Sequence, residues 1–506
     1  MTFHHRLAIF MTFCILQPFI LHALNTSPLF SLDFSKAEEW KQSETTFLKT
    51  EGDTTFLRLE AVEPDKHVMI YRRLYLPQAN RPVALRLTAR IRAVAIEHGA
   101  QNWNNGHLIL KYKDNNDKEI PPVAIDLQFH GTTDWQTIDK VFKVPANASY
   151  LEIMPYLLQA KSGCLDIAQL DIYAATKDDL PKPPPIVASA KMAPLEQTPS
   201  PLRVHGNRLV DENGKEVWLQ GVCIDSLQWS AGGEQILKSL QVAIDQWHAN
   251  VIRLPVTDEF WAGRNKWQKD KGLKYRELFD SVIREANRKN AYVIVDLHRF
   301  KSPQDEHLEF WRDVATRYGN QPGVIFELFN EPHSIGWAEW KSAMQKLLDT
   351  VRQTGANNVA IVGGLDWGYD LTGVASGEYI LSDTPTGRGI VYSSHIYPWK
   401  FQWDKFVLKA AEKHPLFIGE VGNPRRWEDF SFIEESARKE KVGVESTWPK
   451  DVIGVIQAKR LNWTAFSFHP KCAPQLLEDW NYTPTPFWGI HVKEALNGTI
   501  FEAKTH

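Results

Sequence analysis

The chain has 506 residues, of which 43% are hydrophobic, and its 58 basic and 61 acidic side chains leave a formal net charge of only −3. That length exceeds what a single hydrophobic core usually serves, so we expect two or three domains. The near balance of charge argues against a nucleic-acid-binding protein and against one drawn to anionic membranes. The 19 Trp residues favour two interpretations equally, namely large cores or ligands with flat apolar faces.

The first 23 residues have the pattern of a secretory signal peptide. Arg6 precedes the apolar stretch 7–21, and Ala23 is a small residue suited to cleavage. The apolar stretch is shorter than the roughly 20 residues that a membrane span needs. We therefore expect a secreted or periplasmic protein that has no integral membrane association after cleavage.

Residues 27–174 are predicted to form an all-β sandwich, because apolar and polar residues alternate with period two and no long amphipathic helix interrupts the region. The longest alternation places these residues on one face: Val83, Leu85, Leu87, Ala89, Ile91 and Ala93. Residues 175–202 contain the proline-rich sequence LPKPPPIVASAKMAPLEQTPSP, which favours extended backbone and predicts an interdomain linker.

Residues 203–500 are predicted to form an α/β domain, a (β/α)₈ TIM barrel. A hairpin with a turn at Asn213-Gly214 comes first. Strand patterns then alternate with helical ones, and the predicted strands lie near 218–223, 250–254, 292–297, 324–330, 359–363, 391–397, 415–421 and 463–468. Eight βα units fit a barrel better than an open doubly wound sheet, for which a glycine-rich phosphate loop is also missing.

Polar side chains gather at the carboxyl ends of the predicted barrel strands, where such barrels carry their chemistry. These residues are Arg253, Asp296, His298, Asn330, Glu331, His395, Tyr397 and Glu420. Hydrolysis of a glycoside needs one carboxylic acid to protonate the leaving oxygen and one carboxylate on the other face of the sugar ring. Glu331 and Glu420 can supply this pair at about 5 Å, the separation that implies retention of configuration. Arg253 and Tyr397 are suited to keep one carboxylate ionised.

The region 203–497 resembles glycoside hydrolase family 5, a cellulase-type family of clan A. The resemblance rests on RLP at 253–255, DLH at 296–298, NEP at 330–332, HIY at 395–397, GE at 419–420 and WTAFSFHP at 463–470. It implies a β-linked glycan as substrate, no cofactor and no metal. It also implies Glu331 as acid/base and Glu420 as nucleophile. The residues implied to bind the sugar are Arg253, His298, Asn330, His395 and Tyr397, with Asn330 on the 2-hydroxyl.

One position departs from the family pattern. Phe466 occupies the place where the family commonly has a sugar-stacking Trp, so the indole donor is lost and the substrate need not be plain cellulose. The N-terminal sandwich resembles a carbohydrate-binding module in architecture and position. Trp103 and Trp135 are its candidate stacking residues, although sandwich cores also use Trp.

Several alternatives stay open at this level. The histidines and Arg253 could be structural, and Glu327 and Asp296 are expected to be structural rather than catalytic. The protein could be a non-catalytic carbohydrate-binding protein, or a relative that cleaves mannan or glycolipids. We expect a monomer without nucleic-acid partners. Four Trp residues that follow predicted strands in the sequence are candidate platforms for sugar rings: Trp229, Trp367, Trp399 and Trp480.

A disulfide is a further open possibility. Cys223 ends the first barrel strand and Cys472 follows the last, and these two strands are neighbours where the barrel closes. A bridge between them requires Cα atoms within about 7 Å, and free buried thiols are the alternative.

Overall fold

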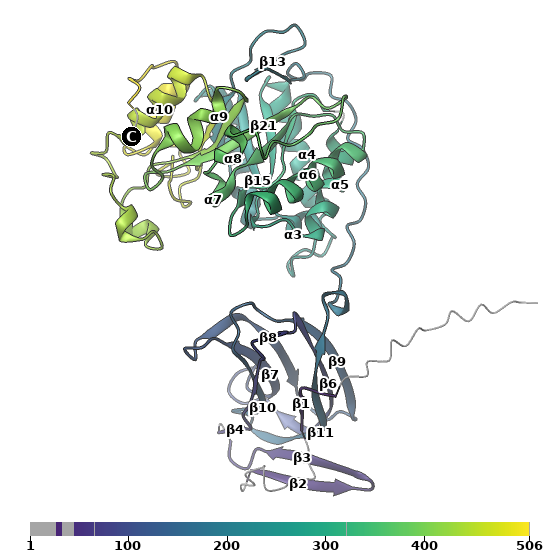
Figure 1. Ribbon diagram of the computed structural model, residues 1–506. Coiled ribbons are helices and arrows are strands. Elements are labelled where there is room, and N and C mark those ends of the chain that lie inside the picture. The colour runs from purple at the N-terminus through teal and green to yellow at the C-terminus, as the bar shows by residue number, and fades with distance from the viewer. Residues whose placement is uncertain (1–26, 33–44, 65, 320, 505–506) are drawn as a thin grey trace, which may run out of the picture. The chain divides into compact units, whose positions relative to one another are not determined.

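A computed structural model of the chain describes residues 27–32, 45–64, 66–319 and 321–504 (Figure 1). The chain divides into two compact units, residues 1–182 and residues 183–506. The predicted signal peptide lies outside the described residues. Among those residues, none of the helices is long and apolar enough to cross a bilayer.

The first unit is built from two antiparallel sheets. One sheet has the order β2-β3-β11-β6-β9, with β1 also paired to β11, and the other has the order β4-β10-β7-β8, with β5 also paired to β10. The first sheet contains β1 (Phe30–Ser31), β2 (Thr46–Glu51), β3 (Thr54–Glu60), β6 (Ala84–Glu97), β9 (Gln136–Lys143) and β11 (Ser162–Ala175). The second contains β4 (His67–Met69), β5 (Arg72–Tyr75), β7 (Gly106–Lys113), β8 (Glu119–Phe129) and β10 (Tyr150–Leu158). A short 3₁₀ turn, Lys177–Asp179, follows β11.

The alternation of β6 explains why these strands form a sandwich. Leu85, Leu87 and Ile91 are fully buried in the core of the unit, while Arg86 and Arg92 on the opposite face pair with acidic residues of neighbouring strands. A strand with one apolar face must bury it against a second layer. The predicted β-sandwich is therefore confirmed.

The proline-rich segment divides between the two units. From Pro183 onward it belongs to the second unit and follows the surface of the barrel helices. The Asp313 carboxylate accepts hydrogen bonds from the backbone N–H and the hydroxyl of Ser189, at 2.6 and 2.7 Å. Met192 is buried in the barrel core, and its N–H donates to the carbonyl of Arg317. Residues 183–202 are thus attached to the barrel at points such as Ser189 and Met192, while most of their side chains are exposed.

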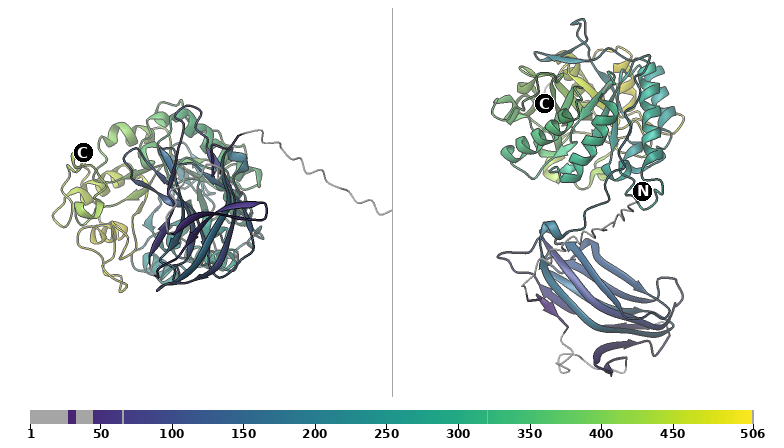
Figure 2. Two further views of the ribbon diagram at one scale, coloured as in Figure 1. Left: turned by 90° about the horizontal axis from the view of Figure 1, so that it is seen from below. Right: turned by 90° about the vertical axis from the view of Figure 1, so that its right-hand side faces the viewer.

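The second unit is a closed barrel of eight parallel strands, as predicted, surrounded by helices (Figure 2). A hairpin, β12 (Arg203–His205) with β13 (Arg208–Val210), precedes it. The barrel strands are β14 (Gln220–Cys223), β15 (Val251–Val256), β16 (Tyr292–Leu297), β18 (Val324–Glu327), β20 (Ala360–Gly363), β21 (Ile390–Ile396), β22 (Leu416–Val421) and β23 (Asn462–Ala465). A separate two-residue pair, β17 (Phe300–Lys301) with β19 (Glu331–Pro332), lies just beyond the barrel strands.

Helices and short helical turns connect the barrel strands. They are α1 (Ser226–Trp229), α2 (Ile236–Asp245), α3 (Asp258–Trp261), α4 (Leu273–Arg288), α5 (Asp305–Tyr318), α6 (Trp337–Gln353), α7 (Leu365–Gly368), α8 (Thr372–Ala375), α9 (Lys409–Ala411), α10 (Trp448–Lys459) and α11 (Gly489–Leu496). A π-helical turn at Asp404–Leu408 and 3₁₀ turns at Trp427–Phe430 and Glu435–Ala437 complete the unit. In α6 the apolar stripe predicted by helical periodicity is fully buried, as at Trp340 and Leu347.

The barrel interior changes from apolar to charged along its axis. Its first layer is apolar and includes Val251, Ile294, Ile325, Ile361, Val391 and Phe417. Two residues further along their strands, Arg253, Asp296 and Glu327 form a fully buried charged layer. Side chains at i and i+2 of a strand point to the same face, so each strand contributes to both layers. The charged layer forms the floor of the site described next.

Candidate active site

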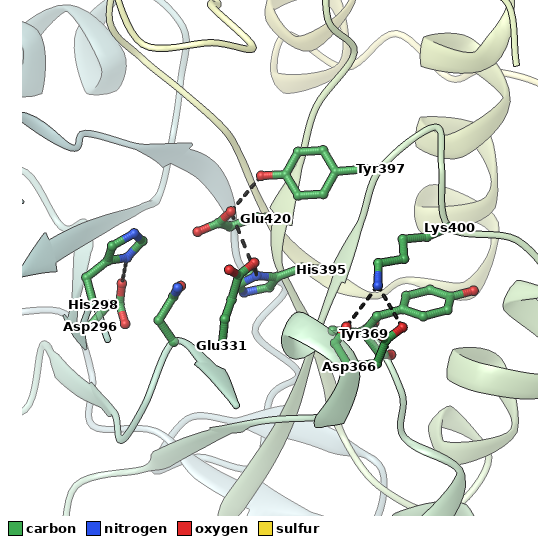
Figure 3. Close-up of polar contacts among 12 residues, drawn as sticks. Asp296, His298, Glu331, Asp366, Tyr369, His395, Tyr397, Lys400 and Glu420 are labelled. Carbon is green, nitrogen blue, oxygen red and sulfur yellow. Dashed lines mark hydrogen bonds and ion pairs between the residues drawn. The ribbon is translucent and has the colours of Figure 1, made fainter. Parts of the chain in front are cut away.

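Glu331 and Glu420 meet at the carboxyl end of the barrel (Figure 3). Glu331 is the first residue of β19, four positions after β18 ends, and Glu420 lies near the end of β22. One carboxylate oxygen from each glutamate and a ring nitrogen of His395 all lie within 4.8 Å of one another. The two acids that sequence analysis paired are therefore brought together, although 89 positions separate them in the chain.

Both oxygens of Glu420 are held by hydrogen bonds. Arg253 Nη1 donates to Oε1 at 2.8 Å, and the Tyr397 hydroxyl donates to Oε2 at 2.6 Å. Burial alone would raise the pKa of this carboxyl, but nearby His395, Arg253 and His298 and the Tyr397 hydrogen bond together lower it to about 2. Glu420 is thus ionised at any ordinary working pH, as a nucleophile must be.

Arg253 is itself fixed by two buried acids. Its Nε donates to Glu327 at 2.6 Å, and its Nη2 lies 2.9 Å from Asp296. All three side chains are fully buried, so each charge is compensated by a partner instead of by water. Glu327 and Asp296 support Arg253 from below, while the guanidinium directs Nη1 upward to Glu420.

Asn330 offers a hydrogen-bond donor to the site. Its Oδ1 accepts from Arg253 Nη2 at 2.7 Å, which fixes the orientation of the amide. Its Nδ2 is buried and has no hydrogen-bond partner among the described residues. A buried N–H without a partner is costly, and a sugar hydroxyl would satisfy it.

His395 lies between the two glutamates. Its Nδ1 donates to Glu331 Oε1 at 2.9 Å and lies 3.8 Å from Glu420 Oε2. Burial lowers the pKa of His395, but the carboxylates of Glu420 and Glu331 raise it above its ordinary value. The ring thus holds the Glu331 carboxyl beside Glu420.

His298 and Phe466 complete the predicted residues. His298 Nδ1 donates to Asp296 at 2.7 Å, and its ring packs edge-on against Phe300. Phe466 follows β23 and is mostly buried, and its carbonyl accepts from Trp488 Nε1. The next residue, Ser467, donates to both oxygens of Asp225 at 2.9 Å.

The two cysteines near the barrel mouth are not joined. Cys223 and Cys472 are both free thiols. Burial raises the pKa of Asp225 to about 6, opposed by hydrogen bonds from Cys472 and Ser467. The free-thiol alternative therefore describes the structure.

Three aromatic rings stand beside Glu331. Trp367, a candidate platform from the sequence, stacks on His333 with ring centroids 3.6 Å apart and planes 14° from parallel. Phe300 contacts Trp367 at 6.0 Å and pairs with Glu331 through the β17–β19 bridge. Trp367 is 47% exposed, so one side of its ring remains open to solvent. Sequence reasoning missed Phe300 and His333, although each follows a catalytic motif, DLH or NEP, by two residues or fewer.

A second stack lies beside Glu420. The ring of Trp399 is parallel to that of Tyr397, with centroids 4.7 Å apart and planes 2° from parallel. Trp399 also contacts Phe430 at 5.1 Å. Here the indole packs against the residue that bonds Glu420, so its first effect is to fix Tyr397.

Lys400 also supports the site, although the sequence patterns do not indicate it. Its Nζ donates to the backbone carbonyl of Asp366 at 2.9 Å and to the Asp366 carboxylate at 2.7 Å (Figure 3). Asp366 and Trp367 both adopt left-handed backbone conformations, with φ of 51° and 61°. Such conformations are unfavourable for residues other than glycine and occur often at functional sites. Lys400 thus ties the turn that carries Trp367 to the loop after β21.

Glu331, His395 and Glu420 also have the ligand types of a metal site. However, Arg253 and Tyr397 already occupy both oxygens of Glu420. A guanidinium bonded to a would-be ligand repels a second cation. The arrangement suits acid–base and nucleophilic chemistry better than metal binding.

Comparisons with known proteins agree with this geometry. The family described as "Cellulase (glycosyl hydrolase family 5)" matches residues 210–471, more than half of the chain. Endoglucanase E-5 of Thermobifida fusca is 27% identical over 254 residues, which cover 48% of this chain and 52% of that protein. An endoglucanase of Paenibacillus polymyxa is 26% identical over 345 residues, covering 54% and 82% of the two chains. This chain thus spans about half the length of the first of these relatives.

Among solved structures, the β-glucanase SdGluc5_26A of Saccharophagus degradans is similar with a TM-score of 0.51 and 25% identity, covering 64% of this chain and 99% of that one. The same β-glucanase has also been solved in complex with cellotetraose. The family match lies in the barrel unit, where the two glutamates meet. The chain belongs to glycosyl hydrolase family 5, the cellulase family.

Proposed function

We propose that this protein is a retaining β-glycoside hydrolase that cleaves a β-linked glucan by double displacement, with Glu331 as acid/base and Glu420 as nucleophile. The observation that carries the proposal is the approach of their carboxylate oxygens to within 4.8 Å. Retaining enzymes hold their two carboxyl groups about 5–5.5 Å apart, whereas inverting enzymes need a wider gap to admit water.

In the first step, Glu331 donates its proton to the glycosidic oxygen while Glu420 Oε attacks the anomeric carbon. The bond to the leaving sugar breaks, and an ester between Glu420 and the anomeric carbon forms. Asn330 Nδ2 is placed to donate to the 2-hydroxyl of the reacting sugar, where hydrogen bonds strengthen in the transition state.

In the second step, Glu331 is a carboxylate and takes a proton from water. The oxygen of that water attacks the anomeric carbon and releases Glu420, so configuration is retained after two inversions. Arg253 and Tyr397 stabilise the departing carboxylate, since both bond the ionised form of Glu420.

Two considerations support a glucan as the substrate. The relatives are named endoglucanases, and the similar β-glucanase was solved with cellotetraose. The exposed ring of Trp367 lies on the side of the acid/base, which is the side of the leaving sugar. An equatorially substituted pyranose presents a flat apolar face to such a ring.

Replacement of Glu420 by Gln tests the proposal. We expect hydrolysis of barley β-glucan to fall by about 10⁴-fold or more, because the amide cannot form the ester. The same change at exposed Glu412 is the matched control and should leave activity unchanged. Normal release of reducing ends by the Glu420→Gln variant would refute the assignment.

A substrate panel separates the remaining alternatives. Pure protein should release reducing ends from a β-1,4-glucan or mixed-linkage β-glucan faster than from mannan, xylan or β-1,3-glucan. Retention on polysaccharide gels without release of reducing ends from any substrate would identify a non-catalytic binding protein instead. Faster cleavage of mannan would correct the sugar but keep the mechanism. Secretion after removal of the signal peptide and a monomeric state remain part of the proposal.

A further inference from the structure

The two sheets of the N-terminal sandwich present different outer faces. On the six-stranded sheet the outer face is a network of arginines and acids, in which Arg58 and Arg92 both bond the buried Asp166. Trp135 lies in this network under the guanidinium of Arg92, at 4.6 Å. Its ring is covered by charged side chains, so Trp135 serves the packing of this face.

The outer face of the five-stranded sheet is aromatic. Along β10, Leu151, Ile153 and Leu157 point into the core, so Tyr150 and Tyr156 point outward. The strand register places Tyr75 opposite Tyr150 and His107 opposite Tyr156. We call this the tyrosine face, defined as Tyr71, Arg73, Tyr75, Trp103, His107, Lys111, Tyr150, Glu152 and Tyr156.

The rings at the two ends of the tyrosine face are open to solvent. Tyr75 is 66% exposed and its ring lies 5.5 Å from that of Tyr150. Trp103 is 57% exposed, in the loop before β7, and its carbonyl accepts from His107 Nε2. Tyr75 lies opposite Tyr150, and Trp103 bonds His107 opposite Tyr156; these two positions of β10 are six residues apart, which corresponds to about 20 Å. That length suits a chain of several sugar rings rather than a monosaccharide.

The basic groups of the tyrosine face are paired with acids on this face or beside it. Arg73 lies 3.6 Å from Asp117, and its guanidinium lies 4.6 Å above the Tyr150 ring. Lys111 lies 3.1 Å from Glu119 and 3.7 Å from Glu152. Because each of these charges is already compensated, the face offers polar hydrogen-bonding groups without a net field to attract an ion.

Positioned polar groups also lie within this face. Glu152 is only 5% exposed and accepts a hydrogen bond from the Tyr71 hydroxyl at 2.5 Å. His107 is 3% exposed and is held by Asp126 at 2.8 Å. These side chains are fixed before any ligand arrives, which lowers the entropy cost of binding.

We propose that the tyrosine face binds a neutral β-linked glucan chain, with Tyr75 and Trp103 as stacking platforms. The choice of a glucan rests on the function proposed for the barrel, while the location and the neutral, hydroxyl-rich chemistry of the ligand rest on the sandwich itself. Flat rings for apolar sugar faces, with fixed polar groups between them, are what such a ligand requires. The first unit of the chain then holds the substrate at a site separate from the catalytic cleft of the second unit.

Native gel electrophoresis of the full chain in the presence of barley β-glucan tests this. The Glu420→Gln background prevents cleavage during the run. We expect retardation of this parent, and an affinity about tenfold lower when Tyr75→Ala and Trp103→Ala are added, since each loses a stacking ring. Both residues are exposed, so the change should leave the melting temperature unaltered. Phe at both positions keeps the rings and should restore most of the affinity.

Tyr173→Ala, on the outer face of the other sheet, is the matched control and should leave retardation unchanged. Equal retardation of the Tyr75/Trp103 double variant and its parent would overturn the proposal, as would absence of retardation of the parent. Stronger retardation by anionic alginate than by barley β-glucan would also overturn it. Cleavage is measured separately with wild-type Glu420 on cellotetraose. Failure of hydrolysis with intact binding would therefore refute the function of the barrel and not that of the tyrosine face.

Discussion

At the scale of single residues, the two glutamates of the site differ in their surroundings. Glu420 receives two hydrogen bonds from Arg253 and Tyr397, and its pKa is lowered to about 2. Glu331 receives one from His395 and keeps part of its carboxyl accessible. This difference in environment supports the proposed roles, attack for Glu420 and proton transfer for Glu331.

The role of Glu331 predicts a dependence on the leaving group. In the Glu331→Gln variant we expect cleavage of barley β-glucan to slow by about 10²–10⁴-fold, because no acid remains to protonate the leaving oxygen. For aryl glycosides with acidic phenol leaving groups, the rate of the first step should fall far less, because these leaving groups need little protonation. Kinetics with a series of substituted phenols measure this. An equal loss for all phenols would argue that Glu331 is not the acid.

The hydrogen bond from Tyr397 predicts a pH effect. It lowers the pKa of Glu420, and activity requires the ionised form, so activity is lost as pH falls through that pKa. Tyr397→Phe removes this contribution and should move the acidic limb of kcat/KM to higher pH. Tyr392→Phe, at a buried tyrosine of β21 remote from Glu420, is the control. An unshifted acidic limb in Tyr397→Phe would contradict the assigned partner.

At the scale of elements, the turn labelled α7 is held in an unfavourable conformation by its neighbours. Asp366 and Trp367 occupy the left-handed region, at a cost of order 1–3 kcal/mol each. Lys400 from the loop after β21 and the stack on His333 offset that cost. The position of the Trp367 ring therefore depends on contacts between separate loops.

Lys400→Met should release this turn. We expect kcat/KM on cellotetraose to fall by about fivefold or more through a higher KM, because the platform for the leaving sugar is no longer fixed. Aryl glycosides with a small leaving group should be nearly unaffected, and Lys400→Arg should retain most of the activity. The matched control is Lys409→Met on α9. Unchanged cellotetraose kinetics in Lys400→Met would show that the hydrogen bonds from Lys400 to Asp366 do not position the Trp367 ring.

At the scale of the whole molecule, two units have separate cores. The sandwich core and the barrel core share no residues, and the division falls at residue 182. Residues 183–202 contribute to the barrel through Asp313, which also accepts from Trp261 Nε1 at 2.8 Å. The stability of the second unit thus includes part of the proline-rich segment.

Differential scanning calorimetry should accordingly show two unfolding transitions. The larger enthalpy belongs to the barrel unit, because unfolding enthalpy scales with residue number. Asp313→Asn should lower the free energy of unfolding of the barrel unit alone, by about 1–3 kcal/mol, because buried donors lose a charged acceptor. Only the transition of that unit should move to lower temperature. Asp404→Asn, at an exposed position, should lower neither. A single transition that shifts as a whole would contradict the independence of the units.

Much of the barrel could be predicted because its signals are local. The eight strands were found from short apolar runs between helical patterns, and the stripe of α6 follows directly from the 3.6-residue period. The pairing of Glu331 with Glu420 follows from the same logic, since strand ends of a parallel barrel meet on one face. The contacts of residues 183–202 with the barrel could not be predicted, because proline-rich composition gives no sign of a partner such as Asp313.

The sequence by itself determined the order of elements, the two folds and the set of polar residues at the strand ends, since hydrophobic periodicity and strand direction are properties of short segments. Only the tertiary structure decided which polar groups touch: that Arg253 bonds Glu420 from above a floor of Asp296 and Glu327, that Lys400 holds the turn of Trp367, and that Cys223 and Cys472 stay free thiols. These contacts join segments many residues apart. Their geometry depends on how the barrel closes and how its loops pack, which no local pattern encodes.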